Sequence, residues 1–434
     1  MLEKPPVLTQ QNYSDVAVKL SDPEVISAIS EINSKYLYWS DVKYKKAGNL
    51  SPQELWAAVK LSRISLYAFN WPEYGIRIPV TSHMQEMCHY FDMNFGGIWG
   101  TESIIPSDSR ERFLTSSQME EAIASSQIEG ASTTRKVAKD MLRRNISPRN
   151  KAEQMIHNNY EAIKYITDHQ NEPLSTAIIL QLHAIMTENT LDNPDEAGRL
   201  RTNNDIIVQD VITGEVVHQP PVFAKLPGFL EQLCSFANSD SEYFIHPVLK
   251  AITIHFLLAY YHPFVDGNGR TARALFYWYM LKNGYWLTQY LSISLAISKS
   301  KSSYEKAYLQ TENDGNDIGY FIEYNLKVLK NAFEELKHYI ETKIAQKQRA
   351  IDILSIGDIN IRQATLLSMY RDNPKLALSI NDIAAKFDIS KPTAMTDISL
   401  LLERGLVKKL PINHKQSNYI KGDRFDEELK IIPQ

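Results

Sequence analysis

The sequence predicts a mainly α-helical protein. Glycine accounts for only 17 of the 434 residues, against a usual share of about 7%, and scarce glycine favours long helices with few tight turns. Apolar residues also recur at helical spacing through much of the chain. Runs that favour β-strands are short and isolated, so the expected strands form small hairpins.

The bulk composition is typical of a globular protein. Hydrophobic residues make up 44% and charged residues 23% of a chain whose length suits two or three domains. The net charge of −4 indicates no general attraction to polyanions. Two cysteines are too few for a disulfide framework and suit a reducing compartment, so we expect a cytoplasmic protein. We expect no secretory signal, because the first residues lack a charged stretch followed by an apolar one. We expect no membrane span, because no apolar run approaches roughly 18 to 20 residues.

Residues 1–105 form the first predicted region, which we expect to be helical. Ser51 and Glu54 make a capping box with Pro52 at the first helical position, and apolar residues at helical spacing follow. A glycine-containing stretch at 92–97 breaks this pattern. It is interpreted as a connection to the next region.

The second region, residues 106–345, begins with a helix predicted at about 115–130. Its apolar residues fall on one side, and Gly130 is well placed to end it. Further helices are expected at 148–169 and 174–189. The region closes with a long helix whose apolar residues keep a 3.5-residue spacing, and this helix could pack on the core or on a second copy of the chain in a homodimer.

A β-hairpin is predicted within this helical region, at about 205–219. The β-prone runs 205–209 and 215–218 flank a turn that contains Gly214, and two prolines end the second strand. An isolated hairpin in a helical protein is often an exposed functional element. The alternative that it is only a connection stays open.

The chemistry of the chain concentrates in a loop between two predicted helices, with the sequence His-Pro-Phe-Val-Asp-Gly-Asn-Gly-Arg-Thr-Ala-Arg over residues 262–273. The first helix is expected to end at Tyr261, and the second to begin around Arg270. His255 lies beside the buried stripe of the first helix. It is interpreted as a core histidine that is satisfied by a hydrogen bond.

Two side chains of the loop suit proton transfer and metal binding. His262 sits at a helix end, where a neutral imidazole could deprotonate an attacking hydroxyl. Asp266 offers hard oxygen ligands, which suit Mg²⁺ held jointly by a carboxylate and substrate phosphates.

The rest of the loop suits an anion. Gly267, Asn268 and Gly269 permit positive φ and can aim main-chain N–H groups at phosphate oxygens. Arg270 and Arg273 lie on the first turn of the following helix and can clamp the same oxygens. With the base and the carboxylate, these groups are the parts that phosphoryl or nucleotidyl transfer requires.

Residues 351–434 form a third predicted region, with a helix-turn-helix pattern of the winged type. A short helix at 380–387 is followed by a helix capped by Ser390 and by predicted strands at 407–410 and 419–421.

The charge of residues 351–434 does not decide what they bind. Twelve Lys and Arg stand against eleven Asp and Glu. Lys391, Thr393 and Thr396 lie at the front of the second helix, with Asp397 beside them. Binding of DNA and binding of a protein both stay open.

The loop resembles the signature of Fic-domain proteins, His-Pro-Phe-x-Asp-Gly-Asn-Gly-Arg-x-x-Arg, without a departure. A Gly198-x-x-Arg201 turn and the hairpin that ends in two prolines also resemble the Fic core, so the resemblance covers roughly residues 115–340. It implies a mainly α fold, with a Fic-type helical core and a β-hairpin flap between an N-terminal helical region and a C-terminal winged helix domain.

The resemblance implies transfer of AMP from ATP, with Mg²⁺, to a Ser, Thr or Tyr hydroxyl of a target protein or of the protein itself. His262 would be the general base and Asp266 the Mg²⁺ ligand. The residues that would bind the nucleotide are Gly267, Asn268, Gly269, Arg270, Arg273 and Tyr304. The flap would register the target segment by strand addition.

The run Ser-Ser-Gln-Ile-Glu-Gly at 125–130 resembles the inhibitory pattern of this family, in which Ser or Thr precedes Glu by four residues and Gly or Asn follows. Ser125 and Glu129 therefore share a helix face. The resemblance implies that Glu129 pairs with Arg273 and takes the site of the γ-phosphate, so that ATP binds poorly or unproductively.

Two alternatives to an auto-inhibited transferase stay open. An ATP-sensing DNA-binding regulator would use the Fic core as the sensor and residues 351–434 as the output. An AMP-removing enzyme would use the same site, with Glu129 orienting a water molecule. Phosphate transfer of the Doc type is disfavoured, because Gly267 and Gly269 are both present.

Overall fold

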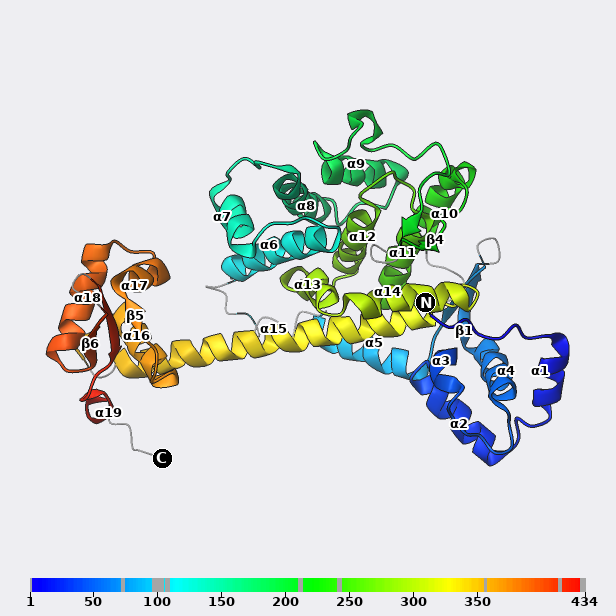
Figure 1. Ribbon diagram of the computed structural model, residues 1–434, viewed down its shortest axis with the longest axis horizontal. Helices are drawn as coiled ribbons and strands as arrows, with labels where there is room; N and C mark the ends of the chain where they lie inside the picture. Colours follow the sequence, from blue (N-terminus) through cyan, green and yellow to red (C-terminus); the bar gives the residue numbers. More distant parts are fainter. Residues whose placement is uncertain are drawn as a thin grey trace. The chain divides into compact units, whose positions relative to one another are not determined.

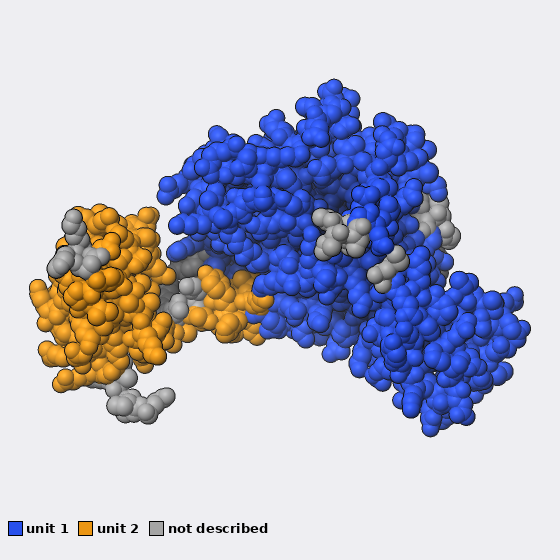
Figure 2. Space-filling model, viewed as in Figure 1, with its two compact units in different colours: residues 1–334 blue, residues 335–434 orange. Residues whose placement is uncertain are grey.

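The computed structural model is mainly α-helical, as predicted (Figure 1). It describes residues 2–71, 75–95, 105, 110–209, 214–239, 244–354, 357–412 and 416–429. The chain divides into two compact units, residues 1–334 and 335–434, and the division falls within helix α15 (Figure 2).

The helices of the described residues are α1 (Gln10–Ala17), α2 (Pro23–Ser34), α3 (Trp39–Val42), α4 (Pro52–Arg63), α5 (Ser82–Phe95), α6 (Arg110–Ile128), α7 (Arg135–Arg144), α8 (Lys151–Asp168), α9 (Thr176–Thr187), α10 (Leu226–Asn238), α11 (Pro247–Tyr261), α12 (Asn268–Lys282), α13 (Ile293–Ser298), α14 (Lys301–Asn313), α15 (Gly319–Leu354), α16 (Ile361–Asp372), α17 (Ile380–Phe387), α18 (Lys391–Glu403) and α19 (Phe425–Glu428). The strands are β1 (Tyr67–Trp71), β2 (Ile76–Pro79), β3 (Val208–Gln209), β4 (Val216–His218), β5 (Leu378–Ser379), β6 (Val407–Pro411) and β7 (Ser417–Lys421).

The N-terminal region is not helical throughout, which corrects the sequence prediction. The strands β1 and β2 form an antiparallel pair between α4 and α5. Phe69 and Trp71 lie with ring centroids 5.8 and 5.4 Å from that of Phe236 on α10. This strand pair is therefore stabilised by a contact with a distant helix, which local sequence patterns do not report.

A buried ionic network joins the N-terminal region to the core. Lys60 of α4 donates to Asp314 (2.8 Å) and to Asp317 (3.2 Å), which lie in the turn between α14 and α15. The hydroxyls of Tyr36 and Tyr67 also donate to Asp317. Buried charges are costly unless they are paired, so this network fixes α4 against the turn between α14 and α15. The N-terminal region and the core accordingly form one compact unit.

Two central helices position the loop of residues 262–267. Helices α11 and α12 pack against each other, and α6, α8 and α9 contact α12 (Figure 1). Both central helices are apolar around most of their circumference, and Phe256 and Trp278 are completely buried. The loop therefore has a rigid support on both sides.

The predicted flap hairpin is present but short. Strands β3 and β4 pair antiparallel, with Gln209 opposite Val216 and Val208 opposite His218. Gly214 adopts a positive φ of 69°. The rest of the predicted turn, including Ile212 and Thr213, lies outside the described residues.

In the second unit the predicted helices and strands occur as α17, α18, β6 and β7. Ser390 accepts a hydrogen bond from the Thr393 N–H (3.3 Å) and caps α18. The structure adds α16 and the short strand β5, and the sheet order is β5-β7-β6, antiparallel throughout. Whether this unit is a winged helix domain that binds DNA stays a prediction.

One residue of this unit was misplaced by the sequence analysis. Asp397 does not lie at the surface beside Lys391 and Thr396, because it is buried and accepts hydrogen bonds from Arg362 and Asn360. It belongs to the face of α18 that packs on α16. The Asp397 carboxylate thus points inward, and the exposed face of α18 lacks its negative charge.

Within the described residues, no helix is long and apolar enough to cross a membrane.

Candidate active site

The loop between α11 and α12 is fixed by its own backbone and by one amide. His262 ends α11 in the left-handed conformation with φ of 46°, and Gly267 precedes α12 with φ of 78°. The Asn268 side chain accepts from the Phe264 N–H and donates to the Phe264 carbonyl, both at 2.9 Å. Helix α12 therefore begins two residues before the predicted start at Arg270, and its first N–H groups face the loop.

The His262 ring is held in one tautomer. Its Nδ1 lies 2.6 Å from the Ala259 carbonyl oxygen, which can only accept, so Nδ1 carries the proton and Nε2 keeps its lone pair. Arg201 donates through Nε to the His262 carbonyl (2.8 Å), and its N–H donates to the Pro263 carbonyl. Burial lowers the pKa of His262 below its ordinary value, because it disfavours the charged ring. The geometry is that of a neutral imidazole ready to take a proton.

Glycine is required at position 267 of the loop, and position 269 is crowded by a neighbouring side chain. A Cβ on Gly267 would lie 2.9 Å from the Thr187 Cγ2, at a φ that other residues rarely adopt. A Cβ on Gly269 would collide with the Glu129 carboxylate. The backbone therefore passes close to its neighbours where an anion would approach it.

Arg270 is a buried cation with unused hydrogen-bonding capacity. Its side chain is completely buried, and its Nη1 donates to the Met186 carbonyl at 2.8 Å. Its Nε and Nη2 have no hydrogen-bond partner in the described part of the chain, and the Asp266 carboxylate is 3.7 Å away. Because buried donors are costly when unpaired, this arrangement suits an anionic ligand.

Arg273 is bound by the end of α6. It donates through Nε to the Ser125 Oγ and through Nη2 to the Ser125 carbonyl, each at 3.0 Å. Its Nη2 also donates to the Glu129 Oε1 at 2.9 Å, and the exposed fractions of the two side chains are 4% and 33%. Burial opposes the charge of Arg273, but Glu129, Tyr304 and Glu121 together outweigh this effect and raise the pKa of the guanidinium. The structure thus brings Ser125, Glu129 and Arg273 together.

Asp266 presents a carboxylate to solvent at the edge of the loop. Its side chain is 51% exposed, and its backbone carbonyl accepts from the His183 Nε2 at 2.9 Å. No group of three or more His, Cys, Asp or Glu residues that could hold a metal occurs among the described residues. A single exposed carboxylate fits Mg²⁺ only when phosphate oxygens and water supply the other ligands.

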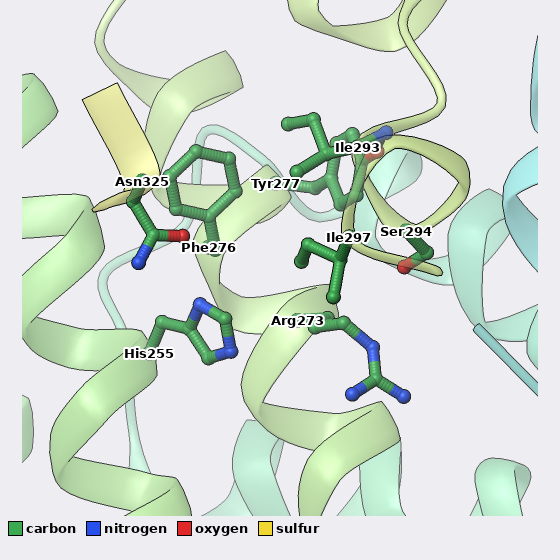
Figure 3. Close-up of a pocket in the computed structure, with 8 residues that line it drawn as sticks. All are labelled: His255, Arg273, Phe276, Tyr277, Ile293, Ser294, Ile297 and Asn325. Atoms are coloured by element: carbon green, nitrogen blue, oxygen red, sulfur yellow. Dashed lines mark hydrogen bonds between the residues drawn. The ribbon is translucent and has the colours of Figure 1, made fainter. Parts of the chain in front are cut away.

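Tyr304 is a buried residue of α14. Its ring is buried, and its hydroxyl lies 2.9 Å from the His255 Nε2 and 3.2 Å from the Tyr308 hydroxyl. His255 is therefore the buried, hydrogen-bonded histidine that the sequence predicted, and burial lowers its pKa to about 3. His255 and Arg273 line a small cavity next to α12, from opposite sides in Figure 3.

Two positioning residues were not identified from the sequence. His183 of α9 accepts from the Gly198 N–H (3.0 Å), and its ring is stacked on Phe264 with centroids 3.7 Å apart. Glu121 of α6 accepts hydrogen bonds from the N–H and the hydroxyl of Ser294 at the start of α13. Both lie in ordinary helical segments, so no local pattern distinguishes them.

The chain matches the model of the Fic/DOC family over residues 173–280. It is 30% identical over 189 residues to the protein adenylyltransferase fic-1 of Caenorhabditis elegans, which covers 44% of this chain and 32% of that protein. It is 31% identical over 165 residues to the protein adenylyltransferase Fic of Drosophila willistoni, and this match covers 38% of this chain and 30% of that protein. The chain thus spans about a third of the length of these relatives.

Two solved structures resemble this fold. A Fic family protein from Desulfovibrio desulfuricans has a TM-score of 0.50 and 19% identity, and the match covers 79% of this chain and 97% of that chain. A form of Fic-1 from C. elegans has a TM-score of 0.50 and 18% identity over 78% and 89% of the two chains. These structures support a common fold.

Proposed function

Residues 173–280 form a Fic domain, and on that premise we propose that the protein is an auto-inhibited protein adenylyltransferase. It moves AMP from ATP to a Ser, Thr or Tyr hydroxyl of a target protein or of itself. The proposal is carried by the neutral His262 imidazole, with Nδ1 bound to the Ala259 carbonyl, and by the Arg270 guanidinium on the first turn of α12, whose Nε and Nη2 lack hydrogen-bond partners among the described residues.

In the proposed reaction the hydroxyl oxygen attacks the α-phosphorus of ATP, and the hydroxyl proton moves to the Nε2 of His262. The bond from the α-phosphorus to the bridging oxygen breaks, and pyrophosphate leaves. The first N–H groups of α12 and the Arg270 guanidinium stabilise the negative charge on the phosphates. Asp266 would hold Mg²⁺, which neutralises phosphate charge when it is bound.

Inhibition in this proposal is a competition for Arg273. The carboxylate of Glu129 takes the donor that a γ-phosphate would use, and the pair is largely shielded from solvent. Shielded pairs are screened by salt less than surface pairs are. Activation therefore requires the Glu129 carboxylate to leave Arg273.

Several contacts hold α6 in the inhibiting position. The fully buried Glu121 carboxylate binds the N-terminus of α13 through Ser294. Ser117 donates to the Tyr290 carbonyl (2.6 Å), and Ser126 donates to the Met155 carbonyl (3.1 Å). These contacts position Glu129 at the end of the helix.

The reaction type is tested by the position of the label. In the Glu129→Gly form, we expect α-labelled ATP to label protein and γ-labelled ATP to leave protein unlabelled, because AMP is retained and pyrophosphate leaves. The measurement is autoradiography after electrophoresis of the full-length protein and of cell lysate. Label from the γ-position alone would show phosphate transfer, and loss of α-label from modified protein during a chase would show AMP removal.

A second candidate function is an ATP-sensing DNA-binding regulator. The inward orientation of Asp397 favours this regulator, because the Asp397 carboxylate then does not lie beside Lys391 on the exposed side of α18. Lys409 on β6 is also exposed. Local basic groups of this kind can contact phosphates although the whole chain is acidic.

A gel shift with genomic DNA fragments at low salt checks this candidate, with and without ATP. DNA binding through this unit predicts retention that weakens in Lys391→Gln and falls with rising salt. An exposed lysine elsewhere, as in Lys35→Gln, serves as the matched control. Absence of any retained fragment at low salt would exclude the regulator.

A further inference from the structure

His218, the last residue of strand β4, faces two hydrogen-bond acceptors. Its Nδ1 lies 2.9 Å from the Glu312 Oε2 on α14, and its Nε2 lies 2.7 Å from the Tyr260 carbonyl oxygen on α11. The side chain is only 9% exposed. Since neither oxygen carries a proton to donate when Glu312 is ionised, both ring nitrogens must be donors.

Only the imidazolium form satisfies both contacts. A neutral ring has one N–H, so its other nitrogen would point a lone pair at an acceptor oxygen. The Glu312 carboxylate stabilises the cation directly. The Tyr260 carbonyl belongs to the last turn of α11, where the negative end of the helix dipole also favours a positive charge.

The charged ring connects the flap to the catalytic loop. His218 pairs with Val208 across the hairpin, and its ring centroid lies 6.4 Å from that of His262. Resting on the proposed transferase function, we infer that His218 is a positioning residue. As an imidazolium held by Glu312, it anchors the flap strand to α11 and keeps a positive charge beside the general base.

The consequence for His262 follows from the charges around it. Burial lowers the pKa of His262, and the His218 charge on β4 and the Arg201 charge lower it further. The Ala259 carbonyl and the Glu129 carboxylate raise it. Because the base must be neutral to accept a proton, the His218 charge extends the active range toward acid pH.

Coulomb's law bounds this effect. A unit charge at the 6.4 Å ring separation lowers the pKa of His262 even in a water-like dielectric, and lowers it more at the smaller effective dielectric constant of a protein. Removal of the His218 charge should therefore move the acid limb of the pH–activity profile, where activity falls toward low pH, upward by about 0.5 to 2 pH units.

The variant Glu312→Gln separates the charge of His218 from its anchoring role. The glutamine amide donates to Nδ1, and Nε2–H still donates to Tyr260, so the ring becomes neutral and stays in place. We expect the acid limb to move upward while the plateau rate is unchanged. In His218→Gln the acid limb moves in the same direction and the plateau rate falls, because the strand end is released.

The experiment measures self-modification by α-labelled ATP as a function of pH, in full-length protein that carries Glu129→Gly. Glu305→Gln, an exposed site on the same helix α14, is the matched control and should leave the profile unchanged. A second readout is the NMR titration of the His262 ring in the same proteins without ATP. It is assigned by comparison with His262→Asn.

An unmoved His262 titration in both Glu312→Gln and His218→Gln would overturn the inference. A plateau rate that falls equally in both variants, with no shift of the acid limb, would also overturn it. If the parent form transfers no label at all, the transferase proposal fails. The NMR titration then still decides the role of the His218 charge.

Discussion

Replacement of Glu129 by glycine is expected to raise the transfer of label from α-labelled ATP by about 10- to 150-fold. This factor corresponds to the roughly 1.5 to 3 kcal/mol of a hydrogen bond to a charged group. The change frees one N–H of the Arg273 Nη2 for the γ-phosphate and leaves both contacts with Ser125 available to hold the guanidinium. The same variant should bind ATP more tightly, which calorimetry measures.

The design of this experiment follows from the position of the residue. Glu129 lies just beyond the end of α6, so glycine there costs little helix stability. Glu111→Gln, at an exposed site in the first turn of the same helix, is the matched control and should leave the rate unchanged. Unchanged labelling by a folded Glu129→Gly protein would exclude inhibition by the carboxylate.

Loss of the His262 imidazole is expected to lower labelling in the Glu129→Gly background by about 10²- to 10⁴-fold, the usual contribution of a general base. His262 has φ of 46°, and asparagine tolerates this conformation better than alanine does. His262→Asn is therefore the safer variant, and His262→Ala should give the same loss. Affinity for ATP should persist, because the phosphate contacts come from α12.

The pH profile offers a further check on the same residue. Because burial lowers the pKa of His262, the neutral base persists below the ordinary histidine value of about 6.5. The midpoint of the acid-side fall in activity should accordingly lie below about pH 6.5. Full labelling by His262→Asn would show that another group removes the proton.

Helices α11 and α18 could be predicted because their signals are local. The helix that ends at Tyr261 and the capped helix after Ser390 were found from apolar spacing and capping residues. The pair β1–β2 was missed, since its aromatic residues are stabilised by Phe236 on a distant helix. Asp397 was assigned to the wrong side of α18 because its partner Arg362 lies on another helix.

The proposed chemistry of the site follows from the sequence itself. The proposed base, the carboxylate, the glycine turn and both arginines occupy the twelve residues 262–273, where backbone geometry alone constrains how they can be arranged. Contacts between distant segments were decided only by the tertiary structure. The bond from Arg273 to Glu129 spans 144 residues, and that from His218 to Glu312 spans 94. Such partners depend on which helix faces pack together, and that choice is made by burial over the whole domain and not by spacing along the chain.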